Sequence, residues 1–355
     1  MRELADAVDV GELRRAARAN KIEALVGVGL REACAGVLPG DWEQALAENA
    51  RRVERLLSAA ASCSVALGAA GIPCALIEGG GTLLGSDLPL EAYGAGDFDF
   101  LVPESAWPQV PGVMADLGYL PKDRRSRPTY RVEFCREDDD RYIEIGSRPF
   151  DRMWLPLLYR DRSPEWLRQR IPSKRRPELH VLAPTDHLLQ VCFHTSLHSY
   201  VRSPGVRLHV DVDRTVRDNA IDWTAFNQGV RAMGIARRAF FSLWMAKDLL
   251  DTPIPGEVLV ALSPGRIRRL LVGRLLAEDG VLANGRPKLT RGRTIALDMM
   301  LEAKGLARWF INAALPPEAW LRDHFERGDT ARLPLALLHL QRYRSALGEW
   351  RPGTD

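Results

Sequence analysis

Residues 97–102, Asp-Phe-Asp-Phe-Leu-Val, limit the fold of this chain more than any other part of its sequence. Successive side chains of an extended strand point to opposite faces, so Asp97 and Asp99 share one face while Phe98 and Phe100 share the other. The phenylalanines can then enter a hydrophobic core while the carboxylates face a cleft. Because carboxylates held this close repel each other, the pattern favours a bound divalent cation such as Mg²⁺, which prefers oxygen ligands.

A glycine cluster precedes the two aspartates. Residues 73–77 read as a short buried strand, which ends at Glu78 and is followed by Gly79, Gly80, Gly81 and Thr82. Glycine allows a ligand to approach the backbone closely, and the amides at the start of a helix attract anions. The cluster therefore predicts a cradle for the phosphates of a nucleotide. A plain strand-to-helix turn, followed by a strand with two solvated acids, explains the same residues.

A third acidic residue is expected on a neighbouring strand. Residues 129–134 and 141–145 are two β-rich runs, and the charged residues 136–140 between them are typical of a hairpin turn. If the isoleucines of the second run face the core, Glu144 faces the same open side as the two aspartates. Three carboxylates on one side can hold two metal ions, which is an arrangement used in nucleotidyl transfer.

The order of these elements resembles the nucleotidyltransferase fold of the DNA polymerase beta superfamily. Residues 42–102 are similar to an uncharacterised bacterial nucleotidyltransferase-like family, in which a helix with an Asn in its first part leads to a Gly-Ile turn, a Lys-Gly strand end and Asp-Ile-Asp-Leu-Leu-Val. Residues 182–216 also resemble the helical half of that family. The resemblance covers most of residues 42–216, and Asp-x-Asp is its one highly specific element.

The resemblance implies the roles of several residues. Asp97 and Asp99 would bind metal, Mg²⁺ or Mn²⁺, and Glu144 would be a third metal ligand or a base. The glycine cluster, Gly79 to Thr82, would contact the triphosphate of an NTP such as ATP. Gly85-Ser86 is an alternative match to the superfamily's Gly-Ser element. The implied activity is transfer of a nucleoside monophosphate to a hydroxyl or phosphate of a small molecule, peptide or protein.

Three departures from the family pattern leave a second hypothesis open. Glu78 stands where relatives usually carry Lys, Gly94 where they often carry Arg, and Gly146 where they often carry His. Absence of the lysine and the arginine favours a catalytically degenerate protein that binds a nucleotide, a peptide or a partner protein. Retention of all three acids favours an enzyme.

The histidines of the second half form a separate pattern. His187, His194 and His198 are spaced seven and four residues apart, so they fall on one face of a helix, and Asp211 and Asp213 follow. A His-x-x-x-His pair with a carboxylate can bind zinc. The same spacing fits a polar helix face bordering the cleft, where His194 and His198 would position the nucleotide or the acceptor. In that interpretation Asp211 holds a neighbouring helix by hydrogen bonds.

Composition and patterning predict an α+β protein with three parts. Residues 1–70 are expected to form N-terminal helices, residues 71–177 a mixed sheet flanked by helices, and residues 178–355 a helical domain, with a linker at 171–177. A net charge of +3 does not favour duplex nucleic acid as a partner. Five dispersed cysteines do not suggest a disulfide scaffold, and without a long apolar run or a leader we expect a cytoplasmic protein with no membrane partner.

Overall fold

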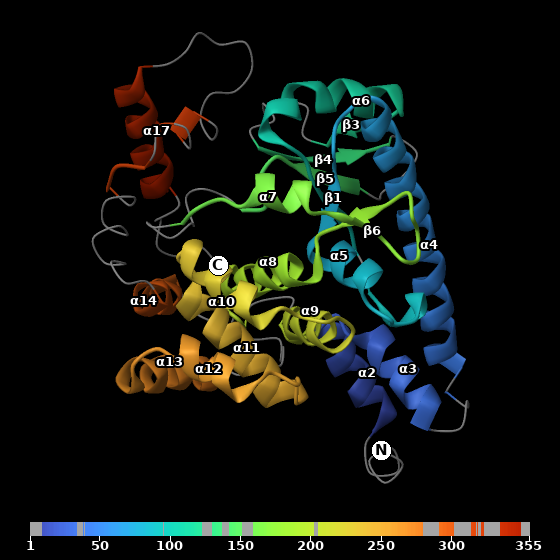
Figure 1. The fold of residues 1–355 in the computed structure, drawn as a ribbon, viewed down its shortest axis with the longest axis vertical. Coiled ribbons are helices and arrows are strands. Elements are labelled where there is room, and N and C mark those ends of the chain that lie inside the picture. The colour runs from blue at the N-terminus through green and yellow to red at the C-terminus, as the bar shows by residue number, and fades with distance from the viewer. Residues whose placement is uncertain are drawn as a thin grey trace.

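A mixed sheet lies among helices in the computed structural model of the chain (Figure 1). The structure describes residues 9–33, 38, 40–94, 96–122, 130–136, 142–150, 159–201, 205–279, 291–301, 314–316, 318, 321–322 and 334–348. Helices precede the sheet along the chain and make up most of the C-terminal half, so the predicted fold class is confirmed. Within the described ranges, none of the helices has the length and apolarity needed to cross a membrane.

The sheet has seven strands in the order β3-β4-β5-β2-β1-β7-β6. Their bounds are β1 Ala75–Ile77, β2 Phe98–Leu101, β3 Leu120–Pro121, β4 Arg131–Cys135, β5 Tyr142–Gly146, β6 Ile171–Pro172 and β7 His180–Val181. β2 pairs with β1 in antiparallel and with β5 in parallel orientation, and β4 and β5 form the expected antiparallel hairpin. Most of the predicted turn of this hairpin, residues 137–140, lies outside the described residues.

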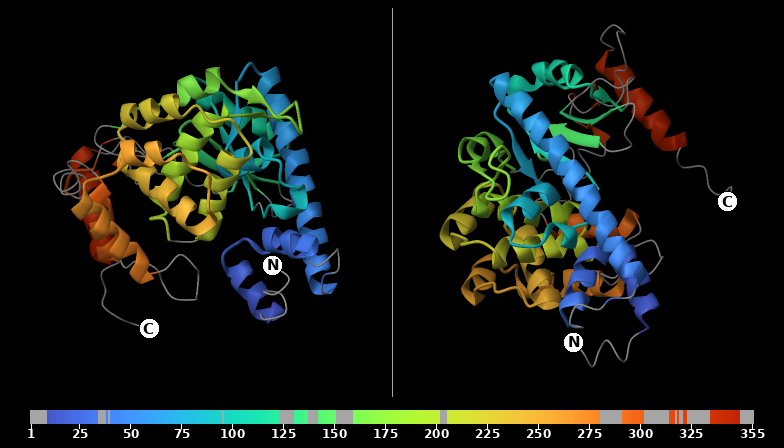
Figure 2. Two further views of the ribbon diagram at one scale, coloured as in Figure 1. Left: turned by 60° about the horizontal axis from the view of Figure 1, so that its bottom comes forward. Right: turned by 90° about the vertical axis from the view of Figure 1, so that its right-hand side faces the viewer.

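One face of the sheet packs against the long N-terminal helix α4 (Gly40–Ala69), which lies across this face in the right-hand view of Figure 2. Two shorter helices precede it: α2 (Val10–Ala19) contacts α3 (Glu23–Ala33), and α3 contacts α4. Phe98 and Phe100 are buried on this face of the sheet in one hydrophobic cluster with Leu56 and Leu57 of α4. The alternation of the Asp-Phe-Asp-Phe run therefore directs its phenylalanines into a core, as predicted.

The opposite face of the central strands packs against helices of the second half. α5 (Glu78–Gly85) contacts α8 (Pro184–Leu197) and α9 (Val206–Arg217), and α8 packs on α11 (Ala236–Leu250). Ala75, Ile77 and Leu101 join the hydrophobic cluster of these helices. The aspartate side of β2 consequently faces α8 and α9, two elements that lie about a hundred residues further along the chain.

Shorter elements complete the described structure. They are η1 Leu90–Ala92, η2 Glu104–Gln109, α6 Val110–Asp116, α7 Ser163–Arg168, α10 Trp223–Ala232, α12 Gly256–Leu262, α13 Arg266–Asp279, α14 Arg291–Leu301 and α17 Leu335–Gly348. The prediction of a linker at residues 171–177 was wrong for its first two residues, because Ile171 and Pro172 form β6, which pairs with β7 and extends the sheet. Val181 of β7 pairs in turn with Leu76 of β1, so the sheet continues past residue 177.

Candidate functional site

Four carboxylates gather where the central strands of the sheet meet. Asp97 directly precedes β2, and Asp99 is in register with Ile77 of β1 and with Glu144 of β5. Glu78 follows β1 and begins α5. The structure therefore brings Asp99 and Glu144 onto adjacent strands on one side of the sheet, as the alternation predicts, and adds Glu78, which the sequence analysis did not assign to the cluster.

Arg131 of β4 lies within this group of acids. Its Nη2 donates a hydrogen bond to Oδ1 of Asp99 at 2.6 Å, its Nη1 lies 3.7 Å from Oε1 of Glu78, and its Nε pairs with Glu144. Arg131 is opposite Gly146 in the hairpin, and a Cβ at Gly146 would lie 3.6 Å from Cγ of Arg131. From this position the side chain of Arg131 reaches acids on β2, on β5 and at the start of α5.

Burial perturbs the ionisation of this group. Burial raises the pKa of Glu78 to about 7; Arg131 opposes this shift, while Asp97 and Asp211 add to it. Burial and then the neighbouring Glu78 raise the pKa of Asp99 well above its usual value. Ionised carboxylates are costly at these positions, so the group favours a positive charge beside it.

His194 of α8 reaches the acids from the other side. Its Nε2 lies 3.3 Å from Oε2 of Glu78, and burial lowers the pKa of His194 to about 4. The ring is therefore neutral at neutral pH and can donate one hydrogen bond. His198 follows the last turn of α8, with its ring edge-on to that of His194 at 4.8 Å between centroids.

The glycines of α5 serve mainly in close packing. A Cβ at Gly80 would lie 3.1 Å from Cδ1 of Phe98, and a Cβ at Gly81 would lie 2.6 Å from Cε1 of His187. Thr82 is buried with its Oγ1 3.0 Å from Nε2 of His187. Of the four residues expected to cradle phosphates, Gly79 lines the pocket described below, and Gly80, Gly81 and Thr82 do not.

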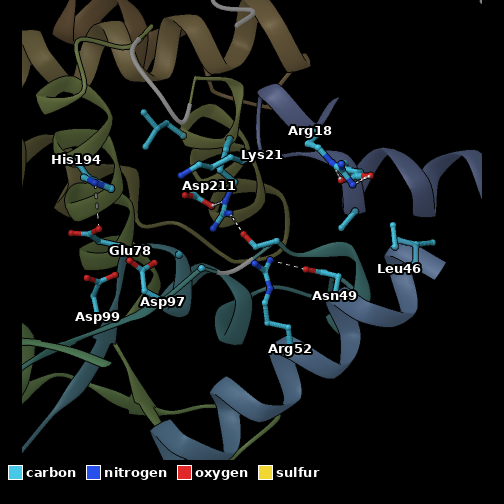
Figure 3. Close-up of a pocket in the computed structure, with 18 of the residues that line it drawn as sticks. Arg18, Lys21, Leu46, Asn49, Arg52, Glu78, Asp97, Asp99, His194 and Asp211 are labelled. Carbon is cyan, nitrogen blue, oxygen red and sulfur yellow. Dashed lines mark hydrogen bonds and ion pairs between the residues drawn. The ribbon is translucent and has the colours of Figure 1, made fainter. Parts of the chain in front are cut away.

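A pocket of about 440 Å³ opens beside the acids. Glu78, Asp97 and Asp99 lie together in it beneath His194, while Asn49 and Arg52 reach in from α4 (Figure 3). Its remaining walls come from the α2–α3 turn, the Gly94 and Gly96 segment and α9. The volume is within the range of small-molecule sites, and several separate parts of the chain supply its charged side chains.

The segment before Asp97 is held from both sides. Nδ2 of Asn49 donates to the carbonyls of Glu91 and Tyr93 at 2.9 and 3.0 Å. The hydroxyl of Tyr93 donates to Oδ1 of Asp211 at 2.6 Å. Asp211 therefore does hold a neighbouring segment by a hydrogen bond, although the segment precedes β2 and is not a helix.

The structure does not gather the histidines into a metal centre. His187 contacts Thr82 inside the fold, whereas His194 faces the pocket. Across the part of the chain that the structure describes, no group of three or more His, Cys, Asp or Glu side chains is arranged to hold a metal ion. Metal binding by Asp97, Asp99 and Glu144 stays a prediction.

Comparison with known protein families agrees with this architecture. A family model described as an uncharacterised nucleotidyltransferase matches residues 6–251. The chain belongs to this family, since the match covers more than half of its length and includes the sheet, α8, α9 and every pocket residue. No curated protein matches the sequence.

Proposed function

We propose that this protein is a metal-dependent nucleotidyltransferase that transfers a nucleoside monophosphate from an NTP to a hydroxyl or phosphate group of an acceptor. The observation that carries the proposal is the register of Asp99 with Glu144 on adjacent parallel strands. Asp97 and Asp99 line the pocket, and Glu144 lies next to Asp99 without lining it. Membership of a nucleotidyltransferase family supports the proposal.

The donor chemistry at the pocket fits a hard divalent cation. The available ligands are carboxylate oxygens, which Mg²⁺ and Mn²⁺ prefer, and Oε1 of Glu78 is buried without a hydrogen-bond partner. Asp97, Asp99 and Glu144 would hold the metal. When bound, it would neutralise negative charge on the triphosphate.

The transfer itself makes and breaks one bond each at the α-phosphorus. The acceptor oxygen forms a new bond to this phosphorus, the bridging bond to the β-phosphate breaks, and pyrophosphate leaves. The acceptor proton needs a base: Glu144 is the candidate from the family resemblance, and Glu78, with a pKa of about 7, suits the same role at neutral pH. Neutral His194, 3.3 Å from Glu78, would orient that carboxylate.

Arg131 favours a second candidate function. Its guanidinium already contacts Asp99 and Glu144, so a permanent internal cation can stand in for a metal. A protein with this arrangement would bind a nucleotide or a partner without turning it over. The two functions differ in whether pyrophosphate is released at all, and in whether nucleotide binding needs the aspartates.

The deciding experiment measures pyrophosphate release and NTP binding together. Each NTP is titrated with Mg²⁺ by calorimetry into the wild type, Asp97→Asn and Asp99→Asn, and release is assayed with candidate acceptors. Asp116→Asn is the matched control, because Asp116 is an exposed carboxylate on α6 outside the pocket. If the protein is an enzyme, the rate of pyrophosphate release falls about a hundredfold or more in Asp97→Asn and Asp99→Asn and stays unchanged in Asp116→Asn. Binding that does not depend on either aspartate, without release in the wild type, would refute the enzymatic proposal in favour of the binding module.

A further inference from the structure

We infer that Arg52 and Arg207 form a subsite for the β- and γ-phosphates of the nucleoside triphosphate. This inference rests on the proposed function and names the part of the pocket that recognises the polyphosphate tail. The two arginines come from α4 and α9, elements on different sides of the acid cluster, and both line the pocket with Asp97.

Arg207 is fixed against the pocket wall by three contacts. Its guanidinium stacks on the ring of Tyr93 with 4.0 Å to the centroid, its Nε lies 3.3 Å from Oδ1 of Asp211, and its Nη1 donates to the carbonyl of Gly94. Its Nη2 lies so near Gly79 that a Cβ there would be 2.6 Å away. A guanidinium held in one orientation loses little entropy when it binds an anion.

Arg52 presents a second guanidinium to the same space. It lies one turn after Asn49 on α4, and its Nη2 donates to Oδ1 of Asn49 at 3.0 Å (Figure 3). Partial burial and then the nearby positive charge of Arg207 lower the pKa of Arg52, while the negative charge of Asp97 opposes this shift. Two cations that repel each other across a pocket are stabilised by an anion between them, and phosphate oxygens accept paired hydrogen bonds from each guanidinium.

The other described cations of the pocket support the same assignment. Lys21 lies in the α2–α3 turn at φ 55° and lines the pocket, whereas Arg18 is bound to Glu23. Gly80 and Gly81 do not line the pocket, so α5 contributes only Glu78 and Gly79 of its first turn to the pocket wall. Side-chain cations are thus the main source of positive potential for a polyphosphate at the pocket. With its β- and γ-phosphates at the two arginines, the nucleotide would have its α-phosphate nearer Asp97, where the proposed metal would lie between the negative charges.

Calorimetry with three ligands tests the assignment. Sodium tripolyphosphate, ATP and AMP, each with Mg²⁺, are titrated into the wild type, Arg52→Gln and Arg207→Gln. The control is Arg51→Gln, because Arg51 is an exposed arginine on the same helix that does not line the pocket. We expect each pocket variant to bind tripolyphosphate and ATP about tenfold or more weakly, AMP to change by less than about twofold, and the control to match the wild type.

The outcomes separate this inference from the proposed function. ATP binding by Arg52→Gln equal to that of Arg51→Gln would overturn the subsite, even where Asp97-dependent pyrophosphate release persists. An equal loss for ATP and AMP would overturn it too, since the arginine would then serve the α-phosphate. Arginine-dependent tripolyphosphate binding without release from any NTP would keep the subsite and reject the enzyme. Thermal unfolding of each variant checks that it is folded. If Arg207→Gln is not folded, the comparison of Arg52→Gln with Arg51→Gln decides the test.

Discussion

Adding one methyl group at Gly81 should destabilise the protein measurably. A Cβ there would lie 2.6 Å from Cε1 of His187 and 3.0 Å from the carbonyl oxygen of Leu76, and the second of these is backbone that cannot rotate away. Overpacking of this kind costs about 1–3 kcal/mol, and the helix preference of alanine offsets at most about 1 kcal/mol. We therefore expect Gly81→Ala to lower the free energy of unfolding by about 1–2 kcal/mol, measured by urea denaturation.

Gly85→Ala is the matched control, because Gly85 ends the same helix and a Cβ there meets nothing within 4 Å. This variant should be neutral or more stable by up to about 1 kcal/mol. In a His187→Ala background, Gly81→Ala should cost less, since its nearest obstacle is gone. Equal stability of Gly81→Ala and Gly85→Ala would refute the packing argument. Wild-type stability with lost NTP binding would instead support a phosphate cradle at Gly81.

Three further results are expected. Burial lowers the pKa of His209 to about 4, so below pH 6.5 the unfolded state binds more protons than the folded state, and stability is lost as the pH falls from 6.5 toward 4. In His209→Gln, the free energy of unfolding from urea denaturation should therefore fall less steeply with decreasing pH, by about 1.4 kcal/mol per pH unit. Arg131→Gln leaves buried acids without their counter-ion, costing about 3–5 kcal/mol, and thermal denaturation should show a larger Mg²⁺-induced rise in Tm than in the wild type. Asn49→Ala removes two hydrogen bonds to residues 91 and 93, and hydrogen exchange should become faster there.

Local patterns in the sequence were enough to predict the acid-bearing face of the sheet. The alternation around Asp99 and Glu144 depends on residues a few positions apart, and strand geometry fixes which side each carboxylate takes. The same alternation places Arg131 and Glu144 on one side, because Val132 and Phe134 face the core, so this arginine was within reach of the sequence analysis.

Contacts between distant segments could not be predicted in this way. Arg207 contacts Gly94, and Asn49 contacts Tyr93. These residues are far apart in sequence, and the packing of α4 and α9 brings them together. The glycines of α5 look the same in sequence whether they face a phosphate or a neighbouring helix. Only the position of His187 above Gly81 tells the two apart.

The pocket draws its charges from opposite ends of the matched region. Glu78, Asp97 and Asp99 lie on segments that follow α4, Arg52 lies on α4, and Arg207 is added only when α9 docks. A chain with its sheet formed but α9 undocked would have the carboxylates in place but lack Arg207, one of the two arginines of the proposed phosphate subsite. The proposed phosphate subsite would therefore be complete only where α9 is docked beside the sheet.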